Sequence, residues 1–298
     1  MLNRLFLTVL ILLSACSKHE RIFKRVSFPF AISQKNVEKK PVPNITIWVH
    51  GTCLWPFTIF RKYWTTDPSL FKVSSMKRDY YLRKVADRLC HISNEYSIND
   101  FYFLRWSGKL SVSEREDTAL HLYKSIKNLL EKYKEEYGVM PNLTVVTHSH
   151  GGNVALNLSK IIDKDPNIKI NKLILLACPV QKHTKDCIKD PMFENVYSFY
   201  STLDFLQVLD PQGLHYCTSS KNEKRDSLFS GRNFPQNSKL CNVKMKINGK
   251  GIWHTQFLSK EFITVLPQVI NKLDKWKKTE NTCHYFVSVV LKKNQLNK

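Results

Sequence analysis

The sequence predicts an α/β fold in which helices cover both faces of a mostly parallel central sheet. Short apolar runs alternate along the chain with longer segments whose apolar residues recur every three or four positions, which indicates strands alternating with amphipathic helices. The runs are apolar throughout, as is typical of parallel strands buried on both faces. With 43% hydrophobic and 24% charged residues, the 298-residue chain has the composition of a globular protein.

Short apolar runs account for the predicted strands. They are Ile45–Val49, Phe101–Trp106, Leu143–Val146, Leu173–Ala177, Val196–Tyr200 and Val243–Ile247. One helix is predicted from Ser113 to the closing Gly138, a second from Asn153 to Ile162 with Ile162 on its apolar side, and a third from Phe257 onward. Ligands bind at the carboxyl ends of the strands in such sheets, so the residues that directly follow these runs are the candidates for function.

The N-terminal segment has the features of an export signal. A basic start at residues 1–4 precedes an apolar run at 5–13, which is too short for a spanning helix of about 20 residues. Residues 13–16 (LSAC) resemble the lipobox of bacterial lipoproteins, and this resemblance implies that residues 1–16 are a signal peptide and that Cys16 is lipidated. Because Ser17 rather than Asp follows, the resemblance implies a membrane-anchored lipoprotein of the cell envelope, at the outer membrane or the periplasmic face. The basic residues 17–40 are expected to form a tether.

Positive charge dominates the composition. The chain has 46 Lys and Arg against 25 Asp and Glu, a formal net charge of +21, and such a surface attracts anions such as lipid headgroups. The basic residues are scattered and form no compact block with interleaved aromatic residues. A nucleic-acid partner is therefore not expected.

The cysteine spacing gives no sign of a metal site. The 8 cysteines include no CxxC pair, and neither a metal-ligand spacing nor a phosphate-binding Gly loop occurs, so no metal or cofactor is expected. If Cys16 is lipidated, an odd number of cysteines remains, and at least one thiol stays free or pairs between chains. A Cys217–Cys241 disulfide is an open alternative.

The segment 145–153 (VVTHSHGGN) carries the strongest chemical signal. A serine hydroxyl needs a neighbouring base and donors for the developing oxyanion before it acts as a nucleophile. A tight strand–turn–helix, described by the pattern G-x-S-x-G, supplies this arrangement and demands small neighbours. Ser149 and Gly151 match the pattern, whereas Thr147 replaces the first glycine. Ser149 is the predicted nucleophile.

With this turn and with His50-Gly51 after the first strand, residues 44–272 resemble the α/β-hydrolase superfamily, in particular its lipase-like and serine-esterase branches. The resemblance implies an α/β-hydrolase fold and a serine hydrolase that cleaves an ester through an acyl-enzyme. It also implies an oxyanion hole with one donor at His150 and a second after the first strand, at Thr52 or alternatively at Cys53.

The family order of serine, acid and then histidine implies the position of the acid. Asp204 follows the predicted strand Val196–Tyr200 and is the favoured acid. Asp210 lies in the same loop and is the alternative, although its neighbour Pro211 favours a role in a turn.

The same order places the base after the last predicted strand. His254 follows that strand and a Gly-rich loop, and it is the favoured base, with His215 and His183 as rivals. In this role His254 accepts the proton of the serine and returns it to the leaving group, while the acid fixes its tautomer. His148 and His150 lie too close to the serine in sequence to act as the base and are candidates for lining the pocket.

The domain organisation follows from these assignments. Residues 41–280 are expected to form the hydrolase domain, with lid-like insertions near 53–83 and 205–243. Residues 281–298 are a C-terminal tail that is a strand, a helix or a docking segment. The first insertion is aromatic and the second is basic, which favours an acyl ester, such as a lipid, with an anionic headgroup.

Other functions are consistent with the same residues. An acyltransferase or a thioesterase with the same triad is the second alternative. A non-catalytic surface lipoprotein that binds anionic partners through its basic face is the third alternative. The sequence predicts no particular oligomeric state.

Overall fold

The computed structural model describes residues 25–26, 42–52, 67–209, 229–280 and 282–291. Its centre is a 10-stranded sheet in the order β1-β10-β8-β7-β6-β5-β2-β4-β3, with β9 paired to β8. Neighbouring strands run parallel except at β3–β4 and β8–β9. The α/β class and the mostly parallel sheet that the apolar runs predicted are therefore confirmed.

The observed strands lie close to the predicted runs. Their bounds are Arg25–Val26 (β1), Asn44–Val49 (β2), Ser69–Lys72 (β3), Phe101–Arg105 (β4), Asn142–His148 (β5), Lys172–Leu176 (β6), Val196–Tyr200 (β7), Leu240–Ile247 (β8), Lys250–Gly251 (β9) and His284–Val289 (β10). Short 3-10 helices cover Val73–Ser75, Ile98–Asp100, Leu158–Lys160, Cys187–Lys189 and His254–Leu258. The antiparallel edge strand β3 was not predicted from the sequence.

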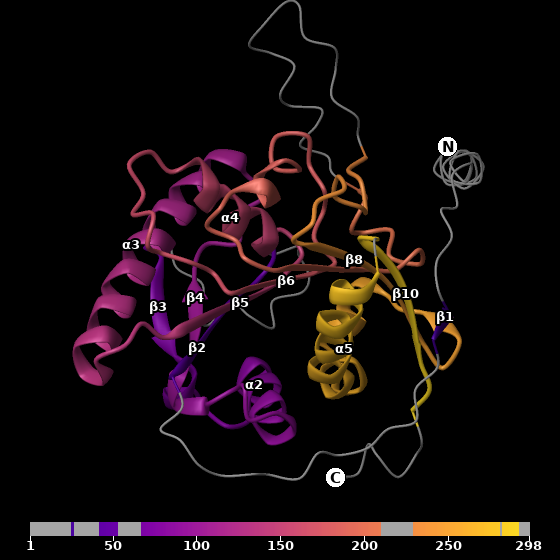
Figure 1. Cartoon of the computed structure of the whole chain (residues 1–298), viewed down its shortest axis with the longest axis horizontal. Coiled ribbons are helices and arrows are strands. Elements are labelled where there is room, and N and C mark those ends of the chain that lie inside the picture. Colours follow the sequence, from indigo (N-terminus) through magenta and orange to yellow (C-terminus); the bar gives the residue numbers. More distant parts are fainter. Residues whose placement is uncertain (1–24, 27–41, 53–66, 210–228, 281, 292–298) are drawn as a thin grey trace, which may run out of the picture.

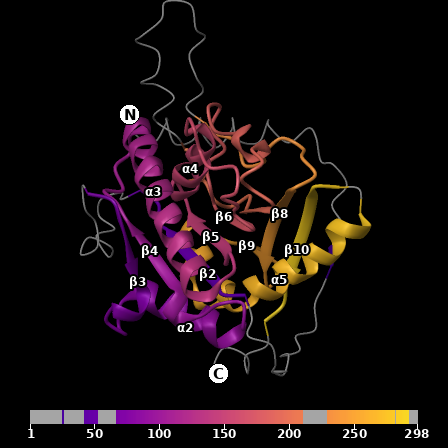
Figure 2. The same ribbon diagram turned by 60° about the vertical axis from the view of Figure 1, so that its left-hand side comes forward.

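Helices pack on both faces of the sheet (Figures 1 and 2). Helices α2 (Tyr81–Ile92) and α5 (Lys260–Thr279) share one hydrophobic cluster with one face of the sheet. Helices α3 (Val112–Tyr137) and α4 (Gly151–Asn157) share a second cluster with the other face. Successive side chains of a strand point to opposite faces, so each buried strand of the sheet contributes to both layers.

Helix α3 has the limits that its sequence predicts. The Ser111 hydroxyl accepts the backbone N–H of Glu114 at 3.3 Å and caps the first turn. At the other end, Gly138 adopts φ 73°, a left-handed conformation that terminates helices and that glycine adopts without strain. The predicted helix from Ser113 to Gly138 is confirmed.

The helix after Ser149 is shorter than predicted. It begins at Gly151 and ends at Asn157, and a 3-10 turn follows it. Ile162 is 84% exposed, so its assignment to the apolar side of this helix was wrong. The chain turns away at Asp163, whose φ of 57° is incompatible with a right-handed helix.

The C-terminal segment includes a strand, one of the three alternatives that the sequence left open. Strand β10 runs parallel to β8 in register from His284–Asn242 to Val289–Ile247, and α5 connects the two. Within the segment expected to be a tether, β1 pairs with the outer edge of β10. The sheet therefore extends beyond residue 280.

The two predicted insertions are described in part. Residues 53–66 and 210–228 lie outside the described residues, as do Cys16, Cys53 and Cys217. Isolated bridges join Leu209 to Phe229 and Val180 to Gly231 at the ends of the second insertion. Cys241, the considered partner of Cys217, is a buried free thiol.

Candidate active site

Ser149 occupies a tight turn between β5 and α4. Its φ is 54°, a left-handed conformation that strains a residue with a side chain. The Ser149 N–H donates to the Leu176 carbonyl of β6 at 2.8 Å, and the Gly152 N–H donates to the Ser149 carbonyl at 3.0 Å. Thr147, which replaces the first glycine of the pattern, is buried, and its hydroxyl donates to the Ile174 carbonyl at 3.2 Å. A threonine is therefore accommodated there, and the strained turn is held by its neighbours.

Glycines allow the turn to pack against the loop after β2. A Cβ atom added to Gly151 would lie 2.4 Å from the Val49 carbonyl oxygen. A Cβ atom added to Gly51 would lie 2.6 Å from the Ser149 Cβ atom. Neither position has room for a side chain, so the predicted nucleophile and the loop expected to hold the oxyanion are in direct contact.

Asp204 and His254 form a buried pair. Asp204 lies in the loop after β7 and is fully buried, and its Oδ2 atom is 2.8 Å from Nδ1 of His254. Its Oδ1 atom accepts the Gln207 N–H at 3.0 Å. His254 begins the 3-10 helix that follows β9. A carboxylate at Nδ1 favours the tautomer that carries its proton there, which leaves Nε2 as the basic nitrogen.

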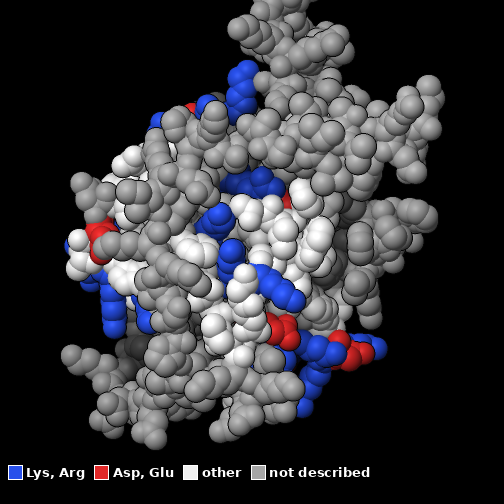
Figure 3. All heavy atoms as spheres, turned by 90° about the vertical axis from the view of Figure 1, so that its right-hand side faces the viewer, with Lys and Arg blue, Asp and Glu red and all other residues white. Residues whose placement is uncertain are grey.

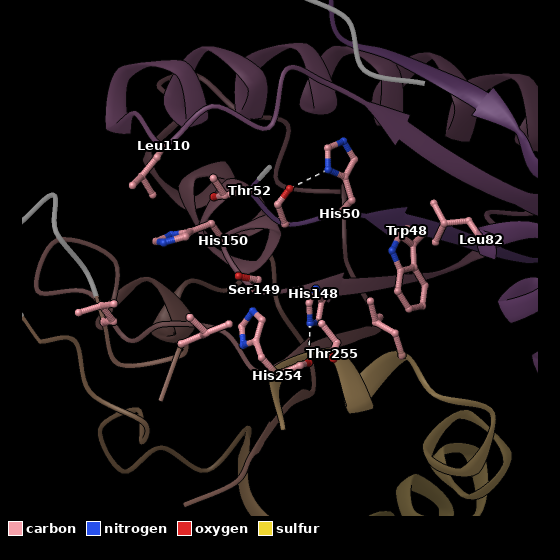
Figure 4. A pocket seen from close by; sticks show the side chains of 14 residues that line it. Trp48, His50, Thr52, Leu82, Leu110, His148, Ser149, His150, His254 and Thr255 are labelled. Atoms are coloured by element: carbon pink, nitrogen blue, oxygen red, sulfur yellow. Dashed lines mark hydrogen bonds between the residues drawn. The ribbon is translucent and has the colours of Figure 1, made fainter. Parts of the chain in front are cut away.

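The base and the serine line one cavity (Figure 4). The cavity has a volume of about 180 Å³, and Ser149 and His254 both contribute to its wall. Each of these residues is 9% exposed. Among the described residues the Ser149 hydroxyl has no hydrogen bond to the His254 ring, although Figure 4 shows the two side chains next to each other. In ligand-free enzymes such catalytic bonds are often long and tighten when substrate binds.

The residues expected to form the oxyanion hole lie at the same cavity. Thr52 and His150 line it together with Ser149, and Figure 4 shows both near the serine. The His150 N–H directly follows the nucleophile in the chain, and Thr52 comes from the loop that contacts the turn through Gly51. The alternative donor Cys53 lies outside the described residues.

Burial keeps the other histidines of the cavity neutral. Desolvation lowers the pKa of His50 to about 4 and that of His148 to about 3. Desolvation, with the nearby Arg115 as a further cause, places the pKa of His150 well below its usual value. Because imidazolium is the charged form, all three rings are uncharged near neutral pH.

His148 has a second role that its position in the sequence did not indicate. Its Nε2–H donates to the backbone carbonyl of His254 at 3.0 Å, and the two ring centroids are 4.7 Å apart. The residue before the nucleophile thus holds the backbone of the base. The only sequence signal for this contact was the proximity of His148 to Ser149.

Arg232 holds the loop that carries the acid. Its Nη2 donates to the Asp204 carbonyl at 2.9 Å, and its Nε donates to the Ser201 carbonyl at 3.2 Å. Arg232 is one of the basic residues of the second insertion, for which the sequence suggested an anionic headgroup, but its contacts here are with the loop that carries the acid. Lys221 lies outside the described residues, as do Lys224 and Arg225.

The rival residues are located only in part. Asp210 and His215 lie outside the described residues. His183 lies in the turn between β6 and β7, and it is not among the described residues that line the cavity. The structure thus brings Asp204 to His254 at the cavity that Ser149 lines, and it does not place His183 in the described wall of that cavity.

Comparison with known proteins gives no guide to this site. No protein-family model matches the chain, and no curated protein matches its sequence. Among the described residues no group of three or more His, Cys, Asp or Glu is placed to hold a metal ion. The helices of the described part include none with the length and hydropathy of a membrane span. The site is therefore interpreted from its geometry.

Proposed function

We propose that this protein is a serine hydrolase that cleaves an ester bond, with Ser149 as nucleophile, His254 as base and Asp204 as the acid that orients it. The single observation that carries the proposal is the combination, at one cavity, of a strained serine with a buried aspartate–histidine pair 2.8 Å apart. Structural ion pairs also bury carboxylates, but they do not require a left-handed serine beside the histidine.

The chemistry follows from the positions of these groups. Nε2 of His254 accepts the hydroxyl proton of Ser149 while the serine oxygen bonds to the ester carbonyl carbon. The carbonyl oxygen becomes an oxyanion, which the N–H groups of Thr52 and His150 stabilise. When the carbon–alkoxy bond breaks, the alcohol leaves with the proton from His254. Water then repeats these steps on the acyl-enzyme and releases the acid.

The order of the site residues along the chain supports a more specific fold assignment. We infer an α/β-hydrolase fold because the serine follows β5, the acid follows β7 and the base follows β8 and β9, in the chain order of that superfamily. A thioesterase or an acyltransferase shares this arrangement: the first differs in releasing a thiol, and the second in an acyl acceptor other than water.

The N-terminal segment supports a proposed location. Residues 13–16 resemble a lipobox, so we propose that Cys16 carries a lipid that anchors the protein in the cell envelope. Mass spectrometry of the membrane fraction would test this. A mature chain that begins at an unmodified residue other than Cys16 would contradict it.

A fluorophosphonate probe tests the proposed activity, because it reacts with activated serines. Residues 17–298 and the Ser149→Ala variant would each be treated with the probe, and the adduct would be mapped by mass spectrometry. We expect an adduct on Ser149 in the first protein and none in the variant. A folded protein that gives no adduct, with or without detergent micelles, would favour the alternative of a non-catalytic binding lipoprotein.

A further inference from the structure

The cavity beside Ser149 has one closed and one open apolar end. Figure 4 shows Trp48 and Leu82 on one side of the serine and Leu110 on the other. Trp48 is 2% and Leu82 is 4% exposed, and both belong to a single buried cluster with Leu258. The other described apolar lining residues are more exposed, at 41% for Leu206 and 48% for Leu209.

Rigid elements build the closed end. Trp48 comes from β2, Leu82 from the first turn of α2, and Leu258 from the end of the 3-10 helix that begins with His254. The Tyr81 hydroxyl donates to the Leu258 carbonyl and joins α2 to this helix. The depth of the closed end is therefore set by packed secondary structure.

The described part of the cavity lining carries no permanent charge. None of its described residues is Lys, Arg, Asp or Glu, and burial keeps His50, His148 and His150 neutral. The chain as a whole has a net charge of +21, and Figure 3 shows Lys and Arg side chains on its surface. A charged group of a substrate would lose its hydration in this cavity and gain no described ionic partner, which is costly.

The cavity is also small. Its volume is about 180 Å³, whereas sites for drug-sized ligands have roughly 300–1,000 Å³. An apolar cavity of about 150 Å³ in another protein holds one benzene molecule. The whole cavity therefore has space for an apolar group of about six carbons, and its closed end takes no more than this number.

The order of the chemical steps decides which part of the ester occupies each end. The alcohol leaves first and water must then reach the acyl-enzyme, so the leaving-group side has to be open to solvent. The acyl group stays bound to Ser149 through both steps. The closed end between Trp48, Leu82 and Leu258 suits the acyl group, and the open end suits the alcohol.

We propose that the closed end is an acyl-binding subsite, that the substrate is a neutral ester with a short apolar acyl chain, and that Leu82 limits the length of this chain. This inference rests on the proposed function and specifies its substrate. It replaces the anionic ester suggested by the basic second insertion, at least for the part of the substrate that enters the cavity.

Two substrate series test the proposal on residues 17–298. In p-nitrophenyl esters from acetate to decanoate, we expect the highest kcat/KM at hexanoate or at a shorter ester. Methyl hexanoate and monomethyl adipate have acyl groups of equal carbon number but differ by a terminal carboxylate, and we expect the neutral ester to be favoured by at least about 100-fold. Decanoate as the best substrate, or equal rates for the two methyl esters, would overturn the proposal.

A pair of variants of one helix tests the role of Leu82. Leu82→Ala enlarges the closed end and should raise the ratio of decanoate to hexanoate kcat/KM by about 10-fold. Leu89 lies two turns further along α2, is buried in the same cluster and does not line the cavity, so Leu89→Ala should leave the ratio unchanged. The ratio is independent of the fraction of active protein. If Leu82→Ala does not fold, Leu82→Met replaces it as the test variant. Its side chain has a similar volume, so the expected change in the ratio is smaller.

The outcomes separate this inference from the proposed function. If neither ester hydrolysis nor probe labelling of Ser149 occurs, the proposed function itself fails. If labelling and hydrolysis occur but Leu82→Ala and Leu89→Ala have the same chain-length profile as the parent, only the acyl subsite is wrong. A shift confined to the Leu82 variants would establish the subsite.

Discussion

The turn at Ser149 and the Asp204–His254 pair lie at one cavity but are stabilised in different ways. The turn is fixed by backbone packing, since Gly51 and Gly151 leave no room for a side chain. The pair is fixed by side-chain hydrogen bonds between residues that are 50 positions apart. The turn is therefore held by close contact between main chains, whereas the pair depends on the loops that bring the side chains of Asp204 and His254 together.

The turn and the pair tolerate different substitutions. A turn held by main-chain contacts fails when volume is added, because the backbone cannot move aside. A hydrogen-bonded pair fails when a partner is changed, even if the shape is kept. Two further side chains stabilise the pair through its backbone: Arg232 donates to the carbonyl of Asp204, and His148 donates to the carbonyl of His254.

The largest expected effect is on activity, at the side-chain pair. Asp204→Asn preserves shape but removes the charge that orients His254, and we expect kcat for ester hydrolysis to fall by about 10³- to 10⁴-fold, by analogy with serine proteases. Asp186→Asn, which changes an exposed carboxylate paired with Lys189, is the control and should have no effect on kcat. Equal activity of the two variants, with unchanged circular dichroism, would exclude Asp204 as the acid.

The next effect is on stability, at the turn. A Cβ at Gly151 would lie 2.4 Å from a backbone oxygen, so Gly151→Ala should lower the free energy of unfolding by about 3 kcal/mol, measured by urea denaturation. At Gly231 the nearest atom would be 3.5 Å away, an ordinary contact, and Gly231→Ala should change stability little. Similar losses in both variants would show that the turn is less tightly packed than described.

A pH dependence should come from the buried histidines. The pKa of His148 is about 3 in the folded protein and 6.5 in the unfolded chain, so between these values the unfolded chain binds the additional proton. Stability should therefore fall as the pH drops from 6.5, by up to about 1.4 kcal/mol per pH unit for this residue. His148→Gln keeps an N–H donor but does not titrate, and urea denaturation from pH 4.5 to 7 should show a smaller slope. An unchanged slope would contradict the assignment of His148 as a buried neutral ring.

The smallest effect concerns the strain at Ser149. Glycine adopts φ 54° without strain, so Ser149→Gly should be more stable than Ser149→Ala by about 1 kcal/mol in the same measurement. In helix α3 the order should reverse, with Ser113→Gly less stable than Ser113→Ala by about 1 kcal/mol. The same order at both positions would mean that the serine is not strained.

Local patterns in the sequence were enough to predict the α/β class, the extent of α3 and the candidate nucleophile. These features depend on local patterns: continuous apolar runs for the buried strands, helical apolar spacing and a closing glycine for α3, and small residues around Ser149. Such patterns act over a few residues, so they can be read without knowing what lies beside them in space.

The assembly of the rest of the site depends on tertiary contacts. In the folded protein Asp204 bonds to His254, and Arg232 and His148 bind the backbone carbonyls of these two residues. Helix α4 ends before Ile162. Each of these depends on contacts between segments far apart in the chain, which no local pattern records. The described lining of the cavity likewise comes from six separate segments of the chain. Burial, and not residue type, keeps His50, His148 and His150 neutral there.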